Sequence, residues 1–201
     1  MRQVSPDNLA AKPVLRRERM PLHDALEIAL LVLLTFVPIN LITARAVVEG
    51  PSMQPTFYTG DLVLVNRAIY FFSNPQRGDV IVLHNPHGRD GSDLIKRVIG
   101  LPNEIVELRD GRVYIDGFLL QEPYIREFCG VGCSGKWTLS GTQYFVLGDN
   151  RPQSYDSHNF GPVERHLIVG QAWIRYYPLS NFTIVEHPSY ALGGPPHSSK
   201  R

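Results

Sequence analysis

The chain has 201 residues, which is enough for one membrane anchor and one domain, or for a domain with a small insertion. Its 20 basic and 19 acidic residues give a net charge of +1, so composition offers neither the basic surface of a nucleic-acid-binding protein nor a polybasic membrane patch. Seventeen glycines and 16 prolines are many for a helical protein and favour short strands joined by turns.

The first predicted element is a single membrane-spanning helix at residues 25–44. Within it, residues 28–44 form a run without any charge, whose length is near the lower limit for crossing a bilayer. Because basic residues outnumber acidic ones before it, the positive-inside rule places residues 1–24 in the cytoplasm and the chain after Arg45 outside. A buried core helix and a cleaved secretory signal are the alternatives. The run is apolar on all sides, whereas a core helix usually has a polar stripe. It is also longer than the apolar region of a usual secretory signal.

After the anchor, the apolar pattern becomes alternating, which predicts strands. Asp110 and Gly111 separate two of these runs and are typical of a tight β-hairpin. Strands are expected at residues 62–65, 79–83, 93–99, 104–108, 112–115, 144–147, 171–177 and 182–185. No helical periodicity of useful length follows the anchor, and the polar tail at 188–201 is expected to be disordered. The predicted fold is therefore mainly β.

The cysteines and histidines give no metal-binding pattern. Cys129 and Cys133 form a lone C-x3-C, which lacks the second pair of ligands of a structural zinc site. A disulfide and two free thiols both remain open for this pair. Histidines such as His84 and His87 show no ligand spacing. We expect no metal and no cofactor.

A serine and a lysine stand where they fit one kind of peptide chemistry. Ser52 lies in a turn between Pro51 and Pro55, which fix φ on either side. A serine hydroxyl is a weak nucleophile and needs a neighbouring base. Lys96 can be that base only when neutral, and burial among its apolar neighbours would lower its pKa. On a strand Arg97 would then point away to solvent. Alone, either motif also fits an ordinary turn or a solvated strand residue.

Three segments together resemble, in order, the boxes of bacterial type I signal peptidases, the membrane-bound Ser-Lys peptidases of the S26 family. They are residues 50–56 (GPSMQPT), 96–102 (KRVIGLP) and 148–151 (GDNR), the last followed by Ser154 and Asp156. The resemblance runs from the anchor to about residue 177. It implies an antiparallel β catalytic domain with a second, inserted β-domain.

The resemblance also implies roles for individual residues. Ser52 would be the nucleophile, Lys96 the general base, and Ser154 the residue that hydrogen-bonds and orients the lysine. Three polar residues match positions that hold the loop beneath the site: Asp149, Arg151 and Asp156. The extracytoplasmic peptidase domain would cover residues 45–187, with the small inserted β subdomain at about 104–142.

Two positions depart from some members of that family. Gly50 stands where certain members have a serine whose hydroxyl joins the oxyanion hole, so only the backbone N–H of Ser52 is identified as a donor. His158 stands where an arginine often follows the last aspartate. On an extended loop Asp156 and His158 would point the same way and could pair. The alternative is that His158 is a surface residue and Arg151 alone holds the loop.

The resemblance implies that the substrates are the signal peptides of exported preproteins, cleaved at the plasma membrane next to lipid. An extended peptide binds by adding a strand to a sheet edge, with shallow pockets for alternate side chains. Val48, Met53 and Ile95 match pocket-lining positions, although each also fits ordinary core packing. Nucleic acid and metal are not expected as partners.

Two other function classes compete with this interpretation. A related Ser-Lys peptidase could process conjugation pilins or cleave itself as a repressor, but a repressor would carry a DNA-binding module and no anchor. A membrane-tethered β-domain could merely bind peptides, but both Ser52 and Lys96 are present. The choice between a plasma membrane and an internal, thylakoid-type membrane stays open.

Overall fold

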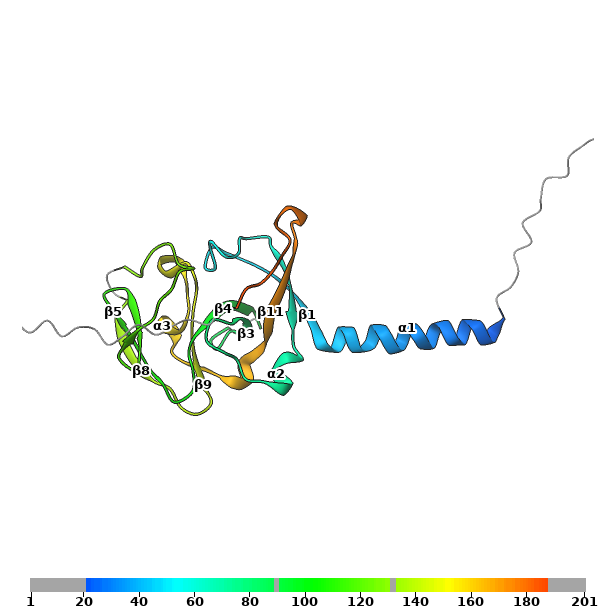
Figure 1. The fold of residues 1–201 in the computed structure, drawn as a ribbon, viewed down its shortest axis with the longest axis horizontal. Coiled ribbons are helices and arrows are strands. Elements are labelled where there is room, and N and C mark those ends of the chain that lie inside the picture. The colour runs from blue at the N-terminus through cyan, green and yellow to red at the C-terminus, as the bar shows by residue number, and fades with distance from the viewer. Residues whose placement is uncertain (1–20, 89–90, 131–132, 188–201) are drawn as a thin grey trace, which may run out of the picture. The chain divides into compact units, whose positions relative to one another are not determined.

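The computed structural model describes residues 21–88, 91–130 and 133–187. The chain divides into two compact units, residues 1–38 and 39–201. The predicted disordered tail and most of the predicted cytoplasmic arm lie outside the described residues. The first unit holds most of one helix, and the second is rich in β-strands (Figure 1).

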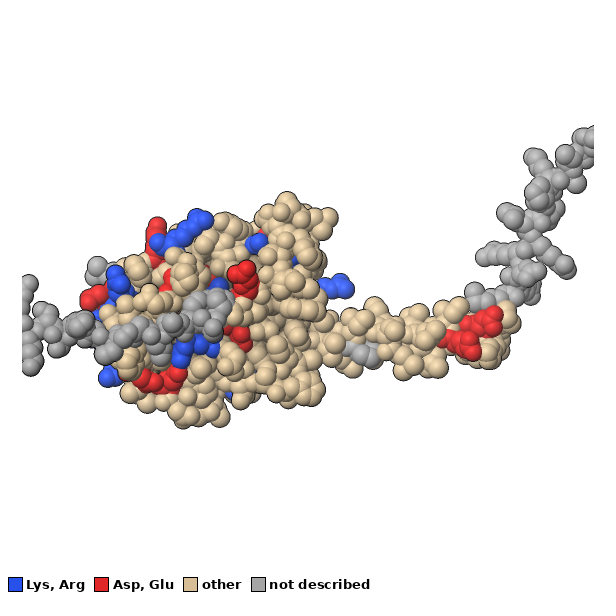
Figure 2. Space-filling view, in the orientation of Figure 1, with Lys and Arg blue, Asp and Glu red and all other residues tan. Residues whose placement is uncertain are grey.

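The first element is one apolar helix, α1 (Leu22–Ile42). Its 21 residues correspond to a length of about 31 Å, the thickness of a bilayer core. Asp24 and Glu27 lie in its first turns, and the helix surface beyond them is free of charge (Figure 2). The helix ends at Ile42 rather than at residue 44, because Thr43 already pairs with Asn66 of a neighbouring strand.

Most of the second unit is one eight-stranded sheet in which every neighbouring pair is antiparallel. The strand order is β1-β2-β11-β3-β4-β9-β10, and β12 pairs with β11. Its strands are β1 (Thr43–Val47), β2 (Leu62–Asn66), β3 (Val80–His84), β4 (Asp93–Gly100), β9 (Gln143–Leu147), β10 (Val163–Glu164), β11 (Ile168–Tyr177) and β12 (Thr183–Ile184). The predicted antiparallel, mainly β fold is confirmed.

A second sheet of four strands forms between residues 105 and 138, in the order β7-β6-β5-β8. These strands are β5 (Ile105–Arg109), β6 (Arg112–Ile115), β7 (Phe118–Leu119) and β8 (Gly135–Thr138). Asp110 and Gly111 connect β5 to β6 with φ of 52° and 73°, so both residues of the predicted hairpin turn have the left-handed conformation that such a turn requires.

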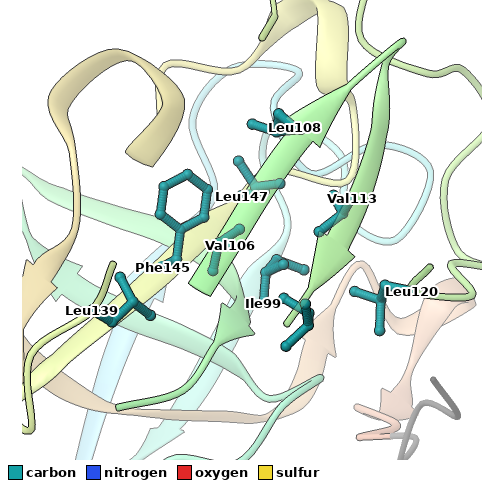
Figure 3. Packing of buried hydrophobic residues seen from close by; sticks show 9 residues of the cluster. Ile99, Val106, Leu108, Val113, Leu120, Leu139, Phe145 and Leu147 are labelled. Carbon is teal, nitrogen blue, oxygen red and sulfur yellow. The ribbon is translucent and has the colours of Figure 1, made fainter. Parts of the chain in front are cut away.

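The two sheets share one hydrophobic core (Figure 3). Ile99 of β4 and Phe145 and Leu147 of β9 pack against apolar side chains of β5 and β6, among them Val106 and Val113. A side chain at position 100 would collide with this cluster, so glycine allows the close approach. The lysine-bearing strand is thus held on one side by β3 and covered by the second sheet near its end.

Several short helical elements were not predicted. They are α2 (Ile69–Phe72), α3 (Ser157–Phe160), η1 (Arg151–Gln153), η2 (Arg165–Leu167) and η3 (Leu179–Asn181). Four residues are too few to show a helical period. The local signal for α3 was a capping box, in which Asp156 accepts from the backbone and Asn159 reaches back to the N-cap N–H.

Candidate active site

The turn that carries Ser52 connects β1 to β2 and is fixed from both sides. Within the turn, the N–H of Gln54 donates to Pro51 O at 3.0 Å. From the loop after β9, the N–H of Asn150 donates to Ser52 O at 3.0 Å, and its side-chain amide donates to Pro51 O at 3.1 Å. Gly50 has φ +76°, a conformation that favours glycine over any residue with a side chain.

Lys96 reaches Ser52 from β4. Its Nζ lies 2.8 Å from Ser52 Oγ and 2.9 Å from Ile95 O, and the side chain is only 3% exposed. Burial lowers the pKa of Lys96 to about 8, although the carboxylates of Asp156 and Asp149 oppose part of that shift. A lysine with this pKa is neutral in a substantial fraction of molecules near pH 8, so its amine can accept the serine proton.

A cleft of about 530 Å³ opens beside the dyad. Its lining is Arg45, Ala46, Val47, Glu49, Ser52, Val82, Ser92, Asp93, Leu94, Ile95, Lys96, Gln153 and Tyr155. The lining thus comes largely from β1, the end strand of its sheet, and from the first half of β4. On the side of β4 opposite β3, the strand pairs with β9 only from Arg97 onward. The cleft therefore lies between strand edges that have backbone groups to offer to an extended peptide.

Asp149 and Arg97 form a buried ion pair beneath the serine turn. The guanidinium donates to both carboxylate oxygens, from Nε at 2.8 Å and from Nη2 at 2.6 Å. Thr56 Oγ1 of the serine turn donates to the same carboxylate at 2.5 Å. The expectation that Arg97 reaches solvent is wrong, because both faces of β4 are covered where it lies and its side chain is buried.

Ser154 is buried next to the dyad, but the hydrogen bond expected from it to Lys96 is absent. Its Oγ has no hydrogen-bond partner among the described residues. The contacts of Lys96 Nζ run instead to Ser52 Oγ and to Ile95 O. Ser154 lies against Gly148, where an added Cβ would collide with its hydroxyl.

Arg151 and Asp156 both hold the backbone of Gly148. Arg151 Nε donates to Gly148 O at 3.1 Å, and Asp156 Oδ2 accepts from Gly148 N at 2.9 Å. Asp156 and His158 do pair, with Nδ1 2.9 Å from Oδ1. The pairing arises because Asp156 caps α3, not because the two residues alternate on an extended loop.

The three predicted pocket residues divide between the cleft and the core. Ile95 lines the cleft. Val48 and Met53 are fully buried in one cluster with Ile95 and do not belong to the cleft lining. They support the cleft from the core. As sequence, an apolar side chain next to the serine turn fits packing against β2 and β3 as well as contact with a substrate, and here it packs.

Cys129 and Cys133 are joined in a disulfide, which decides between the two states left open by their spacing. The His158 ring lies close to this bond, with Nε2 3.7 Å from Cys133 Sγ. The two sulfurs and the imidazole are near enough for a metal site. In the disulfide, however, the sulfurs are not the thiolates that bind metals.

Sequence reasoning missed two residues that reach the last box from the segment between β7 and β8. Glu122 pairs with Arg151, with Nη1 to Oε2 at 3.0 Å, and Tyr124 donates from its hydroxyl to Glu122 Oε1 at 2.6 Å. Nothing in their local sequence, QEPYI, marks them as site residues.

Comparison with known proteins identifies the family. The family described as "Signal peptidase, peptidase S26" matches residues 22–177. The chain belongs to this family. The activity of the peptidase is accordingly the removal of signal peptides, and it is a serine peptidase of the signal peptidase I type.

Individual relatives carry the same description. A signal peptidase I of Leptolyngbya laminosa is 39% identical over 152 residues, covering 71% of this chain and 73% of the relative. A signal peptidase I of Bacillus caldolyticus is 37% identical over 149 residues, covering 68% and 80%. The crystal structure of a signal peptidase I from Enterococcus faecalis V583 is 36% identical, with a TM-score of 0.43 over 49% of this chain and 97% of that one.

Proposed function

We propose that the peptidase cleaves signal peptides with a Ser-Lys dyad, in which Ser52 is the nucleophile and Lys96 the general base. The observation that carries the proposal is the 2.8 Å contact between Lys96 Nζ and Ser52 Oγ at a buried lysine. A buried amine with a pKa of about 8 is a base that works near neutral pH, unlike an ordinary lysine.

The proposed reaction follows from this contact. Ser52 Oγ attacks the scissile carbonyl while Lys96 takes the serine proton. The protonated lysine then gives that proton to the leaving amine of the substrate. Neutral Lys96 next activates a water molecule, which releases the acyl group from Ser52. The Ser52 N–H supports the oxyanion. Asp149, Arg151 and Asp156 hold the loop that contacts the serine turn, and Ser154 packs beside the dyad. None of these steps calls for a metal or cofactor.

The substrate would lie extended in the cleft between β1 and β4. The free backbone groups of these strands can pair with a peptide added between them. Ile95 would contact alternate side chains and Val48 and Met53 would support the cleft from the core, which favours small residues before the cleavage point. These are the features of a signal peptide cleavage site.

The dyad would work at a membrane surface. The helix α1 is long and apolar enough to cross a bilayer, by length and composition. We place the anchor in α1, Leu22–Ile42 rather than 25–44, the peptidase domain from Thr43 to residue 187, the inserted β subdomain at about 104–142, and the arm before the helix in the cytoplasm. The disulfide between Cys129 and Cys133 supports an oxidising compartment for the domain.

The topology has a direct test. Ser5→Cys places a single new cysteine near the N-terminus, and Ser189→Cys makes the same change near the C-terminus. A membrane-impermeant maleimide added to intact cells is expected to label Ser189→Cys and not Ser5→Cys, with the wild-type protein as the background. The reverse labelling pattern would show that the peptidase domain faces the cytoplasm.

The activity is tested with the purified full chain in detergent and a labelled preprotein. We expect release of the signal peptide at one bond, identified by mass spectrometry, and no release by Ser52→Ala. Cleavage of a pilin precursor but not of secretory preproteins would favour the conjugation-type peptidase. Binding without cleavage would favour the peptide-binding alternative.

The pH dependence of the reaction follows from the lysine. Only neutral Lys96 accepts the serine proton, so kcat/KM is expected to rise with pH through about 8 and then level off. Rates of preprotein cleavage measured between pH 6 and 10 check this. A flat profile across that range, with the chemical step shown to limit the rate, would contradict a lysine base.

A further inference from the structure

We propose that Glu122, in the segment between β7 and β8, is a positioning residue for hydrolysis that acts on the nucleophile through Arg151. This inference rests on the proposed Ser-Lys function. It assigns to the inserted segment a part in catalysis, carried by a chain of contacts that runs from Glu122 to the peptide of Ser52.

The chain of contacts ends at Gly148, whose backbone lies against the serine turn. A Cβ at this position would collide with Ser52 O and with Ser154 Oγ, so no side chain separates the two loops. Two residues further on, the N–H of Asn150 donates to Ser52 O at 3.0 Å. A shift of the Gly148 peptide therefore moves the backbone of the nucleophile.

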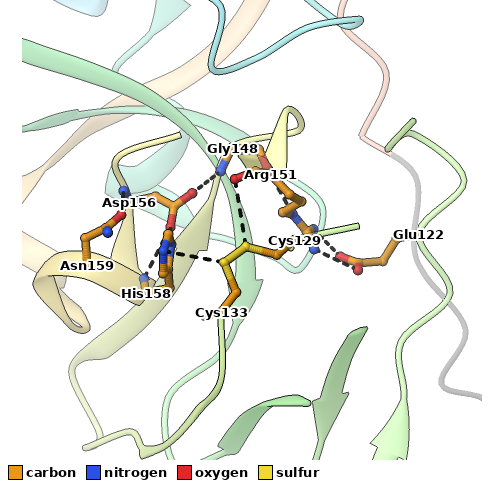
Figure 4. The surroundings of a disulfide bond; sticks show 8 residues. All are labelled: Glu122, Cys129, Cys133, Gly148, Arg151, Asp156, His158 and Asn159. Atoms are coloured by element: carbon orange, nitrogen blue, oxygen red, sulfur yellow. Dashed lines mark hydrogen bonds and ion pairs between the residues drawn. A yellow bond between two sulfur atoms is a disulfide. The ribbon is translucent and has the colours of Figure 1, made fainter. Parts of the chain in front are cut away.

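Each polar group of the Gly148 backbone is held by a charged side chain (Figure 4). Arg151 Nε donates to the carbonyl at 3.1 Å, and Asp156 accepts from the N–H at 2.9 Å. Asp156 pairs with His158, whose Nε2 lies 3.7 Å from Cys133 Sγ. The segment thus holds Arg151, on the carbonyl side of Gly148, through Glu122, and on the other side its disulfide lies near His158.

Glu122 holds Arg151 with two parallel hydrogen bonds, from Nη1 to Oε2 at 3.0 Å and from Nη2 to Oε1 at 2.5 Å. Both side chains are buried, with 2% of Arg151 and 3% of Glu122 exposed. A paired fork of this kind fixes the plane of the guanidinium as well as its charge. That plane sets the direction in which Nε donates to Gly148 O.

Tyr124 fixes the carboxylate in turn. Its hydroxyl donates to Glu122 Oε1 at 2.6 Å, and burial followed by the Glu122 charge raises the pKa of Tyr124 well above its usual value, so the donor stays protonated. The Tyr124 ring also lies 4.3 Å from Cζ of Arg97, the partner of Asp149. Glu122 and Tyr124 therefore contact the arginines of the last box and of the lysine box, Arg151 and Arg97 respectively.

The experiment compares Glu122→Gln with Glu127→Gln, an exposed glutamate of the same segment. Both are assayed as full chains in detergent with a labelled preprotein, well below their unfolding temperatures. We expect Glu122→Gln to lower kcat roughly 10- to 100-fold with KM changed less than about twofold, since misplacing a reacting group costs rate rather than binding. Glu127→Gln should match the wild type.

A double-variant cycle separates positioning from simple stabilisation. Because Glu122 acts through Arg151, adding Glu122→Gln to Arg151→Gln should lower kcat no further. An additive loss would overturn the proposed route, as would a Glu122→Gln protein that melts earlier but keeps its kcat at low temperature.

A milder variant keeps the proposal testable where Glu122→Gln does not fold. Tyr124→Phe removes only the hydroxyl that orients Glu122, and kcat should fall roughly threefold, the size of one hydrogen bond. An unchanged kcat would overturn the proposal. If the wild type cleaves and Ser52→Ala does not, any such negative result counts against Glu122 alone and leaves the Ser-Lys function standing.

Discussion

Lys96→Arg is expected to lower kcat by at least about 100- to 1,000-fold, the range for loss of a general base. Arginine preserves the positive charge and most of the length of lysine, but it does not lose its proton in the pH range of the assay. The amine that lies 2.8 Å from Ser52 Oγ would be replaced by a group that can only donate. The loss should therefore approach that of Ser52→Ala.

The matched control for this variant is Lys136→Arg, on an exposed position of β8. It makes the same chemical change away from the cleft and should leave kcat and KM unaltered. Cleavage of a labelled preprotein is compared at pH 8, where about half of the wild-type Lys96 side chains are neutral and able to accept a proton. Substantial turnover by Lys96→Arg would rule out the dyad.

Asp149→Asn is expected to lower the free energy of unfolding by about 3–5 kcal/mol, the usual result of removing one partner of a buried ion pair. The amide cannot accept both hydrogen bonds from Arg97 as the carboxylate does, and the guanidinium charge stays in the interior. Thr56 and Arg97 then compete for the single amide oxygen, so the serine turn should loosen as well. Denaturant unfolding in detergent, followed by tryptophan fluorescence, measures the change.

Asp93→Asn is the control for that prediction. Asp93 also pairs, with His84 at 2.7 Å, but the two side chains are 45% and 61% exposed. Even a fully charged pair this exposed contributes only roughly 0–1 kcal/mol, so this variant should unfold close to the wild type. If Asp93→Asn and Asp149→Asn lower the free energy of unfolding equally, burial is not what makes the Asp149 pair stabilising.

The sequence was most informative at the two residues of the proposed dyad. Ser52 and Lys96 stand out because a bracketed turn and an apolar strand are local features, and their order along the chain matches one family. The hairpin at Asp110 and Gly111 was also predictable, since left-handed backbone at two successive residues strongly favours these types. The apolar helix α1 needed only length and composition.

What the sequence did not reveal depends on which surfaces the tertiary structure covers. Strand alternation correctly puts Lys96 and Arg97 on opposite faces, but it does not show that both faces of β4 are covered there. Glu122 is one of many glutamates until Arg151 is brought beside it from 29 positions away. Val48 and Met53 fit pocket and core equally well as sequence, and only their burial distinguishes the two.

The burial of Lys96 also bears on how stable the protein is. The amine has a pKa of 10.5 in the open chain and about 8 in the fold. The unfolded chain therefore binds more protons between these values, so folding gains stability from this group as pH rises from about 8 to 10.5 and lacks that gain at neutral pH. A difference of this size corresponds to roughly 3 kcal/mol. The peptidase thus folds less favourably at neutral pH because of the residue proposed as its general base, and a Lys96→Met chain would be the more stable one.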